Sequence, residues 1–154
     1  MTDLPEMSVE RIFNAPKDLV YSAWTKAEHF QHWFLPPGFK TVLCEIDARV
    51  GGMFRIHWED ADGNRYPNKG IYTRVEPTDL VAYEDSFDDD RENNTPTQVT
   101  VSFEDVGDGK TRVVTHSLFA NHEILEQMKT MGAVEIWNLT LDQAVAYIEG
   151  LASA

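Results

Sequence analysis

The alternation of hydrophobic and polar residues predicts a chain made largely of β-strands. Residues 7–13 alternate imperfectly, and the Asn14-Ala15-Pro16 sequence ends this first strand, because proline cannot continue a hydrogen-bonded ladder. Short extended runs, separated by turn residues, follow in the centre of the chain. They predict about six further antiparallel strands, over residues 39–47, 53–59, 68–75, 80–85, 97–105 and 110–118.

Two short helices are predicted between the first strand and the central strands. The first begins just inside Pro16, whose fixed backbone angle suits the first turn of a helix. The second covers residues 26–34, and the Pro36-Pro37-Gly38 sequence ends it. Hydrophobic residues recur at helical spacing in both segments, which predicts one buried face on each helix.

A long helix is predicted at the C-terminus, where hydrophobic residues recur every three or four positions from Val134 to Leu151. Asn121 can cap its N-terminus. A continuous helix from His122 to Leu151 would span roughly 45 Å, at about 1.5 Å per residue. Gly132 weakens the middle of this helix and is a candidate position for a bend.

This order of elements predicts an α+β fold in one domain over residues 1–154. A sheet with one apolar face has to cover that face, and the C-terminal helix is the only long amphipathic element available. We therefore expect a curved antiparallel sheet of about six or seven strands wrapped around the long helix. Such a sheet rarely closes tightly on one helix, so the space between them can form a pocket.

Composition and charge narrow the classes of function. The chain has 13 basic and 26 acidic residues, and its net charge of −13 argues against binding to nucleic acid or to an acidic membrane surface. No apolar run approaches the ~20 residues of a membrane span. The acidic residues 1–8 do not resemble a secretory signal. The single cysteine, Cys44, is expected to be reduced, which indicates a cytoplasmic protein without disulfides.

No motif for metal binding or covalent catalysis stands out. His29 and His32 lie three residues apart and can share a helix face, but a third ligand is missing, so a polar helix surface is the favoured interpretation. The acidic run at residues 88–90 lacks the ligand spacing of a calcium loop and is expected to be a solvated loop. Cys44 lies in a predicted strand, where burial as a small hydrophobic residue is expected. We therefore expect no metal, no cofactor and no catalytic residue.

Several short motifs occur along the chain in a particular order: Arg11-Ile12-Phe13-Asn14-Ala15-Pro16, Trp33, Arg49-Val50-Gly51-Gly52, Asp62-Gly63, Gly70-Ile71-Tyr72, Thr111-Arg112-Val113 and Trp137 with Leu141. Their order and spacing resemble the START-like (SRPBCC, helix-grip) superfamily. Within it, the chain is similar to the branch that contains the C-terminal domain of the activator of heat-shock protein 90 ATPase. The resemblance covers essentially the whole chain. It implies the helix-grip fold, which pollen allergens share, and a hydrophobic ligand held between sheet and helix.

One departure from the family pattern is visible on the C-terminal helix. The family often has Gly-Trp where this chain has Ile136-Trp137, which adds bulk near the expected pocket.

Three functions remain open. The leading hypothesis is the binding of a small hydrophobic or amphipathic molecule, such as a lipid, in the cavity. The resemblance also suggests a co-chaperone-like domain that acts on a heat-shock ATPase, although the eukaryotic activators have an additional N-terminal domain that this sequence does not contain. The third is a cyclase-like or hydrolase-like enzyme that uses the same cavity, with His116 or Glu84 as general base. Strand edges also permit a homodimer.

Aromatic residues supply most of the candidate ligand-binding side chains, because the chain has four Trp, five Tyr and eight Phe. Each can equally belong to the core. Polar residues such as Arg74, Glu84 and His116 lie among the same strands, as expected for a pocket with apolar walls and a few polar groups. The predicted ligand-binding residues are Trp33, Phe54, Ile56, Trp58, Tyr72, Tyr83, Val101, Phe103, His116, Met131, Val134 and Trp137.

Overall fold

The computed structural model describes residues 4–92 and 94–153, and within them the chain forms seven strands and four helices. The predicted α+β class, with two short helices after the first strand, is confirmed. In chain order the elements are β1 (Glu6–Phe13), α1 (Lys17–Thr25), α2 (Ala27–Trp33), β2 (Lys40–Ile46), β3 (Met53–Glu59), β4 (Arg65–Glu76), β5 (Leu80–Phe87), β6 (Thr97–Gly107), β7 (Lys110–Leu118), α3 (His122–Thr130) and α4 (Ala133–Ala152).

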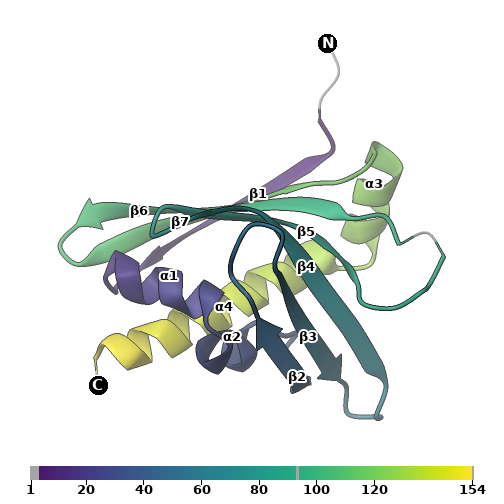
Figure 1. Ribbon diagram of the computed structural model, residues 1–154, viewed down its shortest axis with the longest axis horizontal. Coiled ribbons are helices and arrows are strands. Elements are labelled where there is room, and N and C mark those ends of the chain that lie inside the picture. The colour runs from purple at the N-terminus through teal and green to yellow at the C-terminus, as the bar shows by residue number, and fades with distance from the viewer. Residues whose placement is uncertain (1–3, 93, 154) are drawn as a thin grey trace.

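All seven strands form one antiparallel sheet in the order β1-β7-β6-β5-β4-β3-β2. Strands β2 to β7 form a meander, and β1 pairs with the last strand rather than with the next one along the chain. Helices α1, α2 and α4 lie on the concave face of the curved sheet, and α3 lies near one end of it (Figure 1). The sheet therefore curves around one side of α4, as the sequence predicts.

The core lies between the concave face and α4. Alternate residues of the central strands face inward, so Phe54 and Ile56 of β3 are almost fully buried. Helix α4 presents Leu141, Ala144 and Ile148 at helical spacing, and all three are fully or almost fully buried. Removal of this apolar surface from water stabilises the fold by about 1.5–3 kcal/mol for each large side chain.

The packing of Phe54 requires a glycine at position 70 of β4. Gly70 pairs with Phe54 across the sheet, and the ring of Phe54 occupies the space where a side chain at position 70 would begin. A Cβ atom on residue 70 would lie 2.1 Å from Phe54 Cε2. The absence of a side chain at Gly70 therefore lets this aromatic ring lie flat on the neighbouring strand.

The C-terminal helical segment is not one continuous helix but is divided in two at Gly132, the position that the sequence offers for a bend. Helix α3 ends at Thr130, and Gly132 precedes α4 with a φ angle of +81°. Glycine reaches this left-handed conformation without the steric cost that a Cβ atom imposes. Asn121 caps α3 as predicted, because its side chain accepts a hydrogen bond from the Ile124 amide at 2.9 Å.

Strand β5 is longer than the alternation predicts. The sequence ends it at Asp85, whereas the structure continues it to Phe87. Asp85 consequently lies inside the sheet, paired with Gly70 on one side and Thr97 on the other. Asp85, the last residue of the predicted strand, is therefore an interior position of β5, and its carboxylate lies in the cavity wall.

Among the described residues, no helix combines the length and the apolar character that are needed to cross a bilayer.

Candidate ligand-binding site

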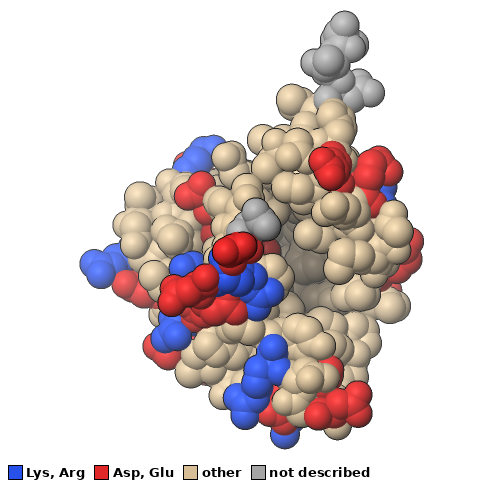
Figure 2. All heavy atoms as spheres, turned by 90° about the vertical axis from the view of Figure 1, so that its right-hand side faces the viewer, with Lys and Arg blue, Asp and Glu red and all other residues tan. Residues whose placement is uncertain are grey.

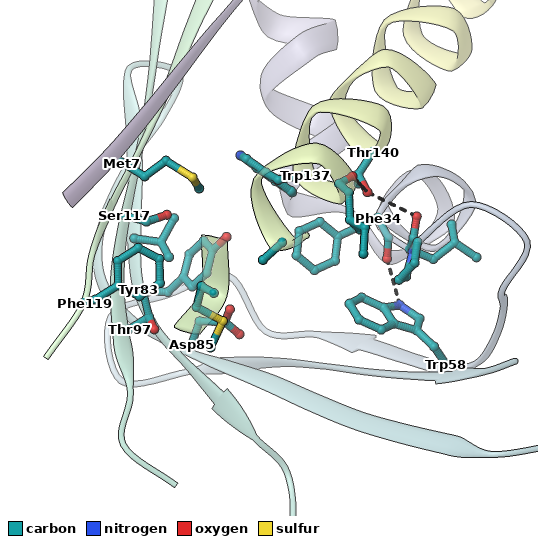
Figure 3. Close-up of a pocket in the computed structure, with 16 residues that line it drawn as sticks. Met7, Phe34, Trp58, Tyr83, Asp85, Thr97, Ser117, Phe119, Trp137 and Thr140 are labelled. Carbon is teal, nitrogen blue, oxygen red and sulfur yellow. Dashed lines mark hydrogen bonds between the residues drawn. The ribbon is translucent and has the colours of Figure 1, made fainter. Parts of the chain in front are cut away.

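A cavity of about 290 Å³ lies between the sheet, the start of α4 and the segment that follows α2. Figure 2 shows the hollow at the end of the molecule where α3 lies, and Figure 3 shows its interior. Its walls are mostly apolar and aromatic, with a few hydroxyl groups and one carboxylate. The lining residues are Met7, Phe34, Leu35, Pro36, Trp58, Tyr83, Asp85, Thr97, Val99, Ser117, Phe119, Met128, Ala133, Ile136, Trp137 and Thr140.

Three aromatic rings lie together in one part of the cavity wall: Phe34 follows α2, Trp58 belongs to β3 of the sheet, and Trp137 belongs to α4. The ring centroid of Phe34 lies 5.8 Å from that of Trp137 and 5.9 Å from that of Trp58. Each indole N–H donates a hydrogen bond within the protein: Trp58 to the Phe34 carbonyl at 2.8 Å, and Trp137 to Thr115 Oγ1 at 3.1 Å. These bonds orient the rings, so this wall is formed before any ligand arrives.

The sheet supplies the polar side of the cavity. Tyr83 and Asp85 are two residues apart on β5 and therefore lie on the same face of the strand. In Figure 3 they lie beside Thr97 and Ser117, and also beside the apolar Met7 and Phe119, across the cavity from Phe34, Trp58 and Trp137. A mainly apolar cavity with polar groups gathered on one side suits an amphipathic ligand.

Asp85 is the most unusual group of the site. No hydrogen bond or ion pair of its carboxylate occurs within residues 4–92 and 94–153. Burial raises the pKa of Asp85 to about 7, because a carboxylate in an apolar wall loses its hydration without gaining a partner. Its charge therefore changes near neutral pH.

A second, polar chamber of about 600 Å³ adjoins the apolar cavity. The two share Asp85, Thr97 and Met128 as lining residues. Asp85 thus lies at the junction between an apolar and a polar space. The remaining walls of the polar chamber carry mostly amide and hydroxyl side chains, namely Asn68, Ser86, Asn94, Thr95, Asn121 and Gln127, together with Phe87, Glu123 and Ile124.

The loop after β5 borders the polar chamber and is held to the sheet. Asp88 accepts a hydrogen bond from Arg55 Nε at 2.7 Å, and its carboxylate lies 2.7 Å from His57 Nε2. Burial would raise the pKa of Asp88, but the bonds from His57 and Arg55 outweigh it and lower the pKa. The guanidinium of Arg91 also covers the ring of Phe87, at 3.6 Å from the centroid. The acidic run at residues 88–90, which the sequence predicts to be a solvated loop, is therefore partly fixed to the sheet. Figure 2 shows charged side chains along one side of the hollow.

The structure distributes the predicted ligand-binding residues over three environments. Trp58, Tyr83 and Trp137 line the cavity. Met131 is 74% exposed at the junction of α3 and α4, Val134 is half-buried outside the cavity wall, and His116 lies on the convex face of the sheet. The others are buried in the core behind the cavity: Trp33, Phe54, Ile56, Tyr72, Val101 and Phe103.

The two proposed general bases do not reach the cavity. Strand alternation places His116 between the inward-facing Thr115 and Ser117, so its side chain lies on the convex face, where Nε2 is 3.6 Å from Glu6 Oε1. Glu84 lies between Tyr83 and Asp85 and faces outward for the same reason. Arg74, the third polar candidate, is exposed and forms an ion pair with Glu76.

Sequence reasoning missed Asp85 and Phe34. The signal for Asp85 was present, because it has the same strand parity as the cavity-lining Tyr83. Its position next to an acidic loop concealed that signal. Phe34 follows α2 directly, and no local pattern distinguishes its ring from the neighbouring core ring of Trp33.

His29, His32 and Cys44 contact or pack against neighbouring parts of the protein. His29 Nδ1 lies 2.9 Å from the Tyr147 hydroxyl, and His32 stacks on the Tyr147 ring, so both contact α4. In the part of the chain that the structure describes, no group of three or more His, Cys, Asp or Glu residues could hold a metal ion. Burial raises the pKa of Cys44 to about 11, so its thiol is protonated at neutral pH and is a weak nucleophile.

Comparison with known proteins assigns the family. The family described as "Activator of Hsp90 ATPase homolog 1-like protein" matches residues 14–149. The chain belongs to this family. No curated protein matches it. The START-like superfamily and the branch inferred from the sequence motifs are therefore confirmed.

Solved structures of similar proteins share the fold along nearly the whole chain. A protein of Nitrosomonas europaea, 22% identical, has a TM-score of 0.85 and is matched over 99% of this chain and 100% of its own. A protein of Staphylococcus epidermidis, 25% identical, also has a TM-score of 0.85, over 97% and 93%. An AHSA1-like protein of Aeromonas hydrophila, 23% identical, has a TM-score of 0.74, over 95% and 93%.

The departure of this chain from the family pattern falls in the cavity. Ile136 and Trp137 both line it. The bulk that the sequence predicts Ile136 to add near the pocket therefore lies at the cavity wall.

Proposed function

We propose that this member of the Activator of Hsp90 ATPase homolog 1-like family binds a small amphipathic molecule in the apolar cavity. The observation that carries the proposal is the composition of the cavity wall: mostly apolar and aromatic side chains, with one carboxylate and a few hydroxyl groups among them. Its volume of about 290 Å³ lies at the lower end of the range for small-molecule sites, roughly 300–1,000 Å³. A ligand with one or two fused rings fits this size.

The rigidity of the aromatic wall supports the same proposal. Trp58 and Trp137 are held by hydrogen bonds from their indole nitrogens, and Phe34 packs between them. A ligand that enters such a site does not have to order these side chains, which lowers the entropic cost of binding. The adjoining polar chamber leaves room for a polar end.

The test fills the cavity without disturbing the fold. Ala133 opens α4 and lines the cavity, whereas Ala146 lies on the exposed face of the same helix. We expect the neutral fluorescent probe N-phenyl-1-naphthylamine to bind the wild type saturably. Ala133→Leu should weaken binding about tenfold or more, because the added methyl groups occupy the ligand volume. Ala146→Leu makes the same change outside the site and should bind like the wild type.

Thermal denaturation provides a second measurement. A ligand at 100 times its dissociation constant stabilises a fold by about 2.7 kcal/mol, which is readily detected. Fatty alcohols and aromatic alcohols with one or two fused rings form a suitable panel. The proposal is wrong if neither the probe nor the panel binds, or if both leucine variants bind like the wild type.

The family description favours a second candidate, an interaction with a heat-shock ATPase. It is tested by adding the protein at micromolar concentration to a purified Hsp90-type ATPase and measuring phosphate release. Stimulation that persists in Ala133→Leu would point to a surface contact that is independent of the cavity. An unchanged rate would remove this candidate.

A further inference from the structure

The charge of Asp85 has no counterpart in either chamber. Among the described residues, neither the apolar cavity nor the polar chamber is lined by a lysine, an arginine or a histidine. The other acidic residue at these walls is Glu123, at the start of α3. Tyr83, Thr97 and Ser117, the polar neighbours of Asp85 in the cavity, are uncharged hydroxyl groups. The charged side chains that line the two chambers therefore give the site a net negative charge.

We propose that the ligand is a hydrophobic amine: its ring body lies against Phe34 and Trp137, and its protonated nitrogen pairs with the carboxylate of Asp85. This inference rests on the proposed function, since the cavity has to accept the apolar body first. Asp85 lies where the apolar cavity meets the polar chamber, so the nitrogen can contact the carboxylate while its remaining N–H groups reach the polar chamber.

Desolvation explains why a cation is preferred. A carboxylate that has lost part of its hydration without gaining a partner is unfavourable, and an ammonium group provides a charged hydrogen-bond donor at that position. A neutral alcohol can donate one hydrogen bond but does not neutralise the charge. An anionic ligand such as a fatty acid would place a second carboxylate beside Asp85 with no cationic side chain to offset it. The net charge of −13 adds a long-range attraction for cations.

The protonation of Asp85 makes this recognition pH-dependent. The titratable groups that share its chambers are Tyr83 on its own strand and Glu123 on α3, while β4, β6 and α4 contribute no charged side chain there. Because burial raises the pKa of Asp85 to about 7, the carboxylate is mostly protonated at pH 6 and mostly ionised at pH 8. The affinity for an amine should therefore increase over this range, and binding near pH 7 should release a proton.

Three ligands with the same ring body and different polar ends provide the experiment: 2-naphthylmethylamine, 2-naphthylmethanol and 2-naphthoate. At about pH 8 the wild type should bind the amine roughly ten- to a hundredfold more tightly than the alcohol, as expected for a charge-assisted hydrogen bond, and the naphthoate least. Isothermal titration calorimetry at pH 6 and 8, in buffers of different ionisation enthalpy, measures affinity and proton release together.

Two variants locate the effect. Asp85→Asn should abolish the preference for the amine and retain binding of the alcohol, whereas Glu123→Gln should keep the preference. Equal affinity of the wild type for amine and alcohol, or a preference that survives in Asp85→Asn, would overturn the inference while the cavity remains a binding site. If the alcohol does not bind either, the proposed function fails as well. The two failures are thus distinguishable.

Discussion

Two aspartates of the same segment show how strongly the environment sets the charge of a residue. Asp85 and Asp88 are three residues apart, yet their pKa values shift in opposite directions. Both lose hydration. For Asp88, hydrogen bonds with Arg55 and His57 compensate the lost hydration. Asp85 has no such partner in the described part of the chain. Carboxylates with a pKa perturbed in this way are common at functional sites, where a bound ligand can provide the missing hydrogen bond or opposite charge.

At this scale we expect Asp85→Asn to stabilise the protein at high pH. A raised pKa means that the folded state binds the proton more tightly than the unfolded state, so wild-type stability falls as the pH rises from about 4 to 7. The amide removes this penalty and should increase the free energy of unfolding by roughly 1–3 kcal/mol at pH 8, after allowance for solvent screening. The advantage should vanish below about pH 4, where the carboxyl is protonated in both states.

Urea unfolding across the pH range measures this effect, with Asp88→Asn as the matched control. The pKa of Asp88 is lowered, so its ionised form contributes stability above the unfolded pKa, and the amide should destabilise the protein at pH 8. Parallel stability curves for Asp85→Asn and the wild type between pH 4 and 8 would contradict the assignment of a raised pKa to Asp85.

At the scale of elements, the break between α3 and α4 shapes the site. Gly132 turns the chain so that α3 leaves the axis of α4 and lies near the end of the sheet (Figure 1). In this position α3 contributes Glu123, Gln127 and Met128 to the polar chamber. A continuous helix would carry these residues onward along the axis of α4. The polar chamber thus depends on one glycine between two helices.

We expect Gly132→Ala to destabilise the protein by about 1–2 kcal/mol. Its φ angle of +81° lies in the left-handed region, where a residue with a Cβ atom is strained. The cost comes from the backbone and not from a clash, because the atom nearest to such a Cβ, Glu135 Oε2, is 3.8 Å away. Gly150 lies within α4 and has open space around it, so Gly150→Ala should instead stabilise by roughly 0.5–1 kcal/mol. Thermal or urea denaturation compares the two variants. A similar gain in stability for both would mean that residue 132 is not held in the left-handed conformation.

At the scale of the whole molecule, the acidic excess lies outside the core. Within residues 4–92 and 94–153 the buried polar side chains are threonines, namely Thr111, Thr115 and Thr140, and every carboxylate, including that of Asp85, keeps some exposure. The negative potential of the protein therefore surrounds an apolar interior, and at the cavity it acts on a site without cationic side chains among the described residues. Such a field attracts a cation from a distance and is reduced by salt.

The rate of ligand association should report this field. We expect the association rate of 2-naphthylmethylamine to fall several-fold as the salt concentration rises from about 0.02 to 0.5 M, because screening shortens the range of the attraction. The rate for the neutral 2-naphthylmethanol should hardly change. Stopped-flow fluorescence can follow both reactions, since Trp58 and Trp137 line the cavity. Equal salt dependence for the two ligands would show that the net charge does not guide binding.

Much of the fold was predictable because its signals are local. The alternation of Phe54 and Ile56 with polar neighbours predicts the buried face of β3, and the three- and four-residue steps through Leu141 and Ile148 predict the buried face of α4. The site was less predictable. Trp33 and Trp137 are both inward-facing tryptophans, yet only the second lines the cavity, because this depends on the distances between helices and strands that are far apart in sequence.

The sequence by itself determined the class of fold, the order of its elements, its family and the acidic surface, because periodicity, turn residues and composition act over short stretches of chain. Only the tertiary structure decided which side chains border empty space and which charge is left without a partner. Asp85 acquires its raised pKa because the sheet and the residues of α3 and α4 that line the two chambers remove water from its carboxylate. Burial of that kind is set by long-range packing, which no local pattern encodes.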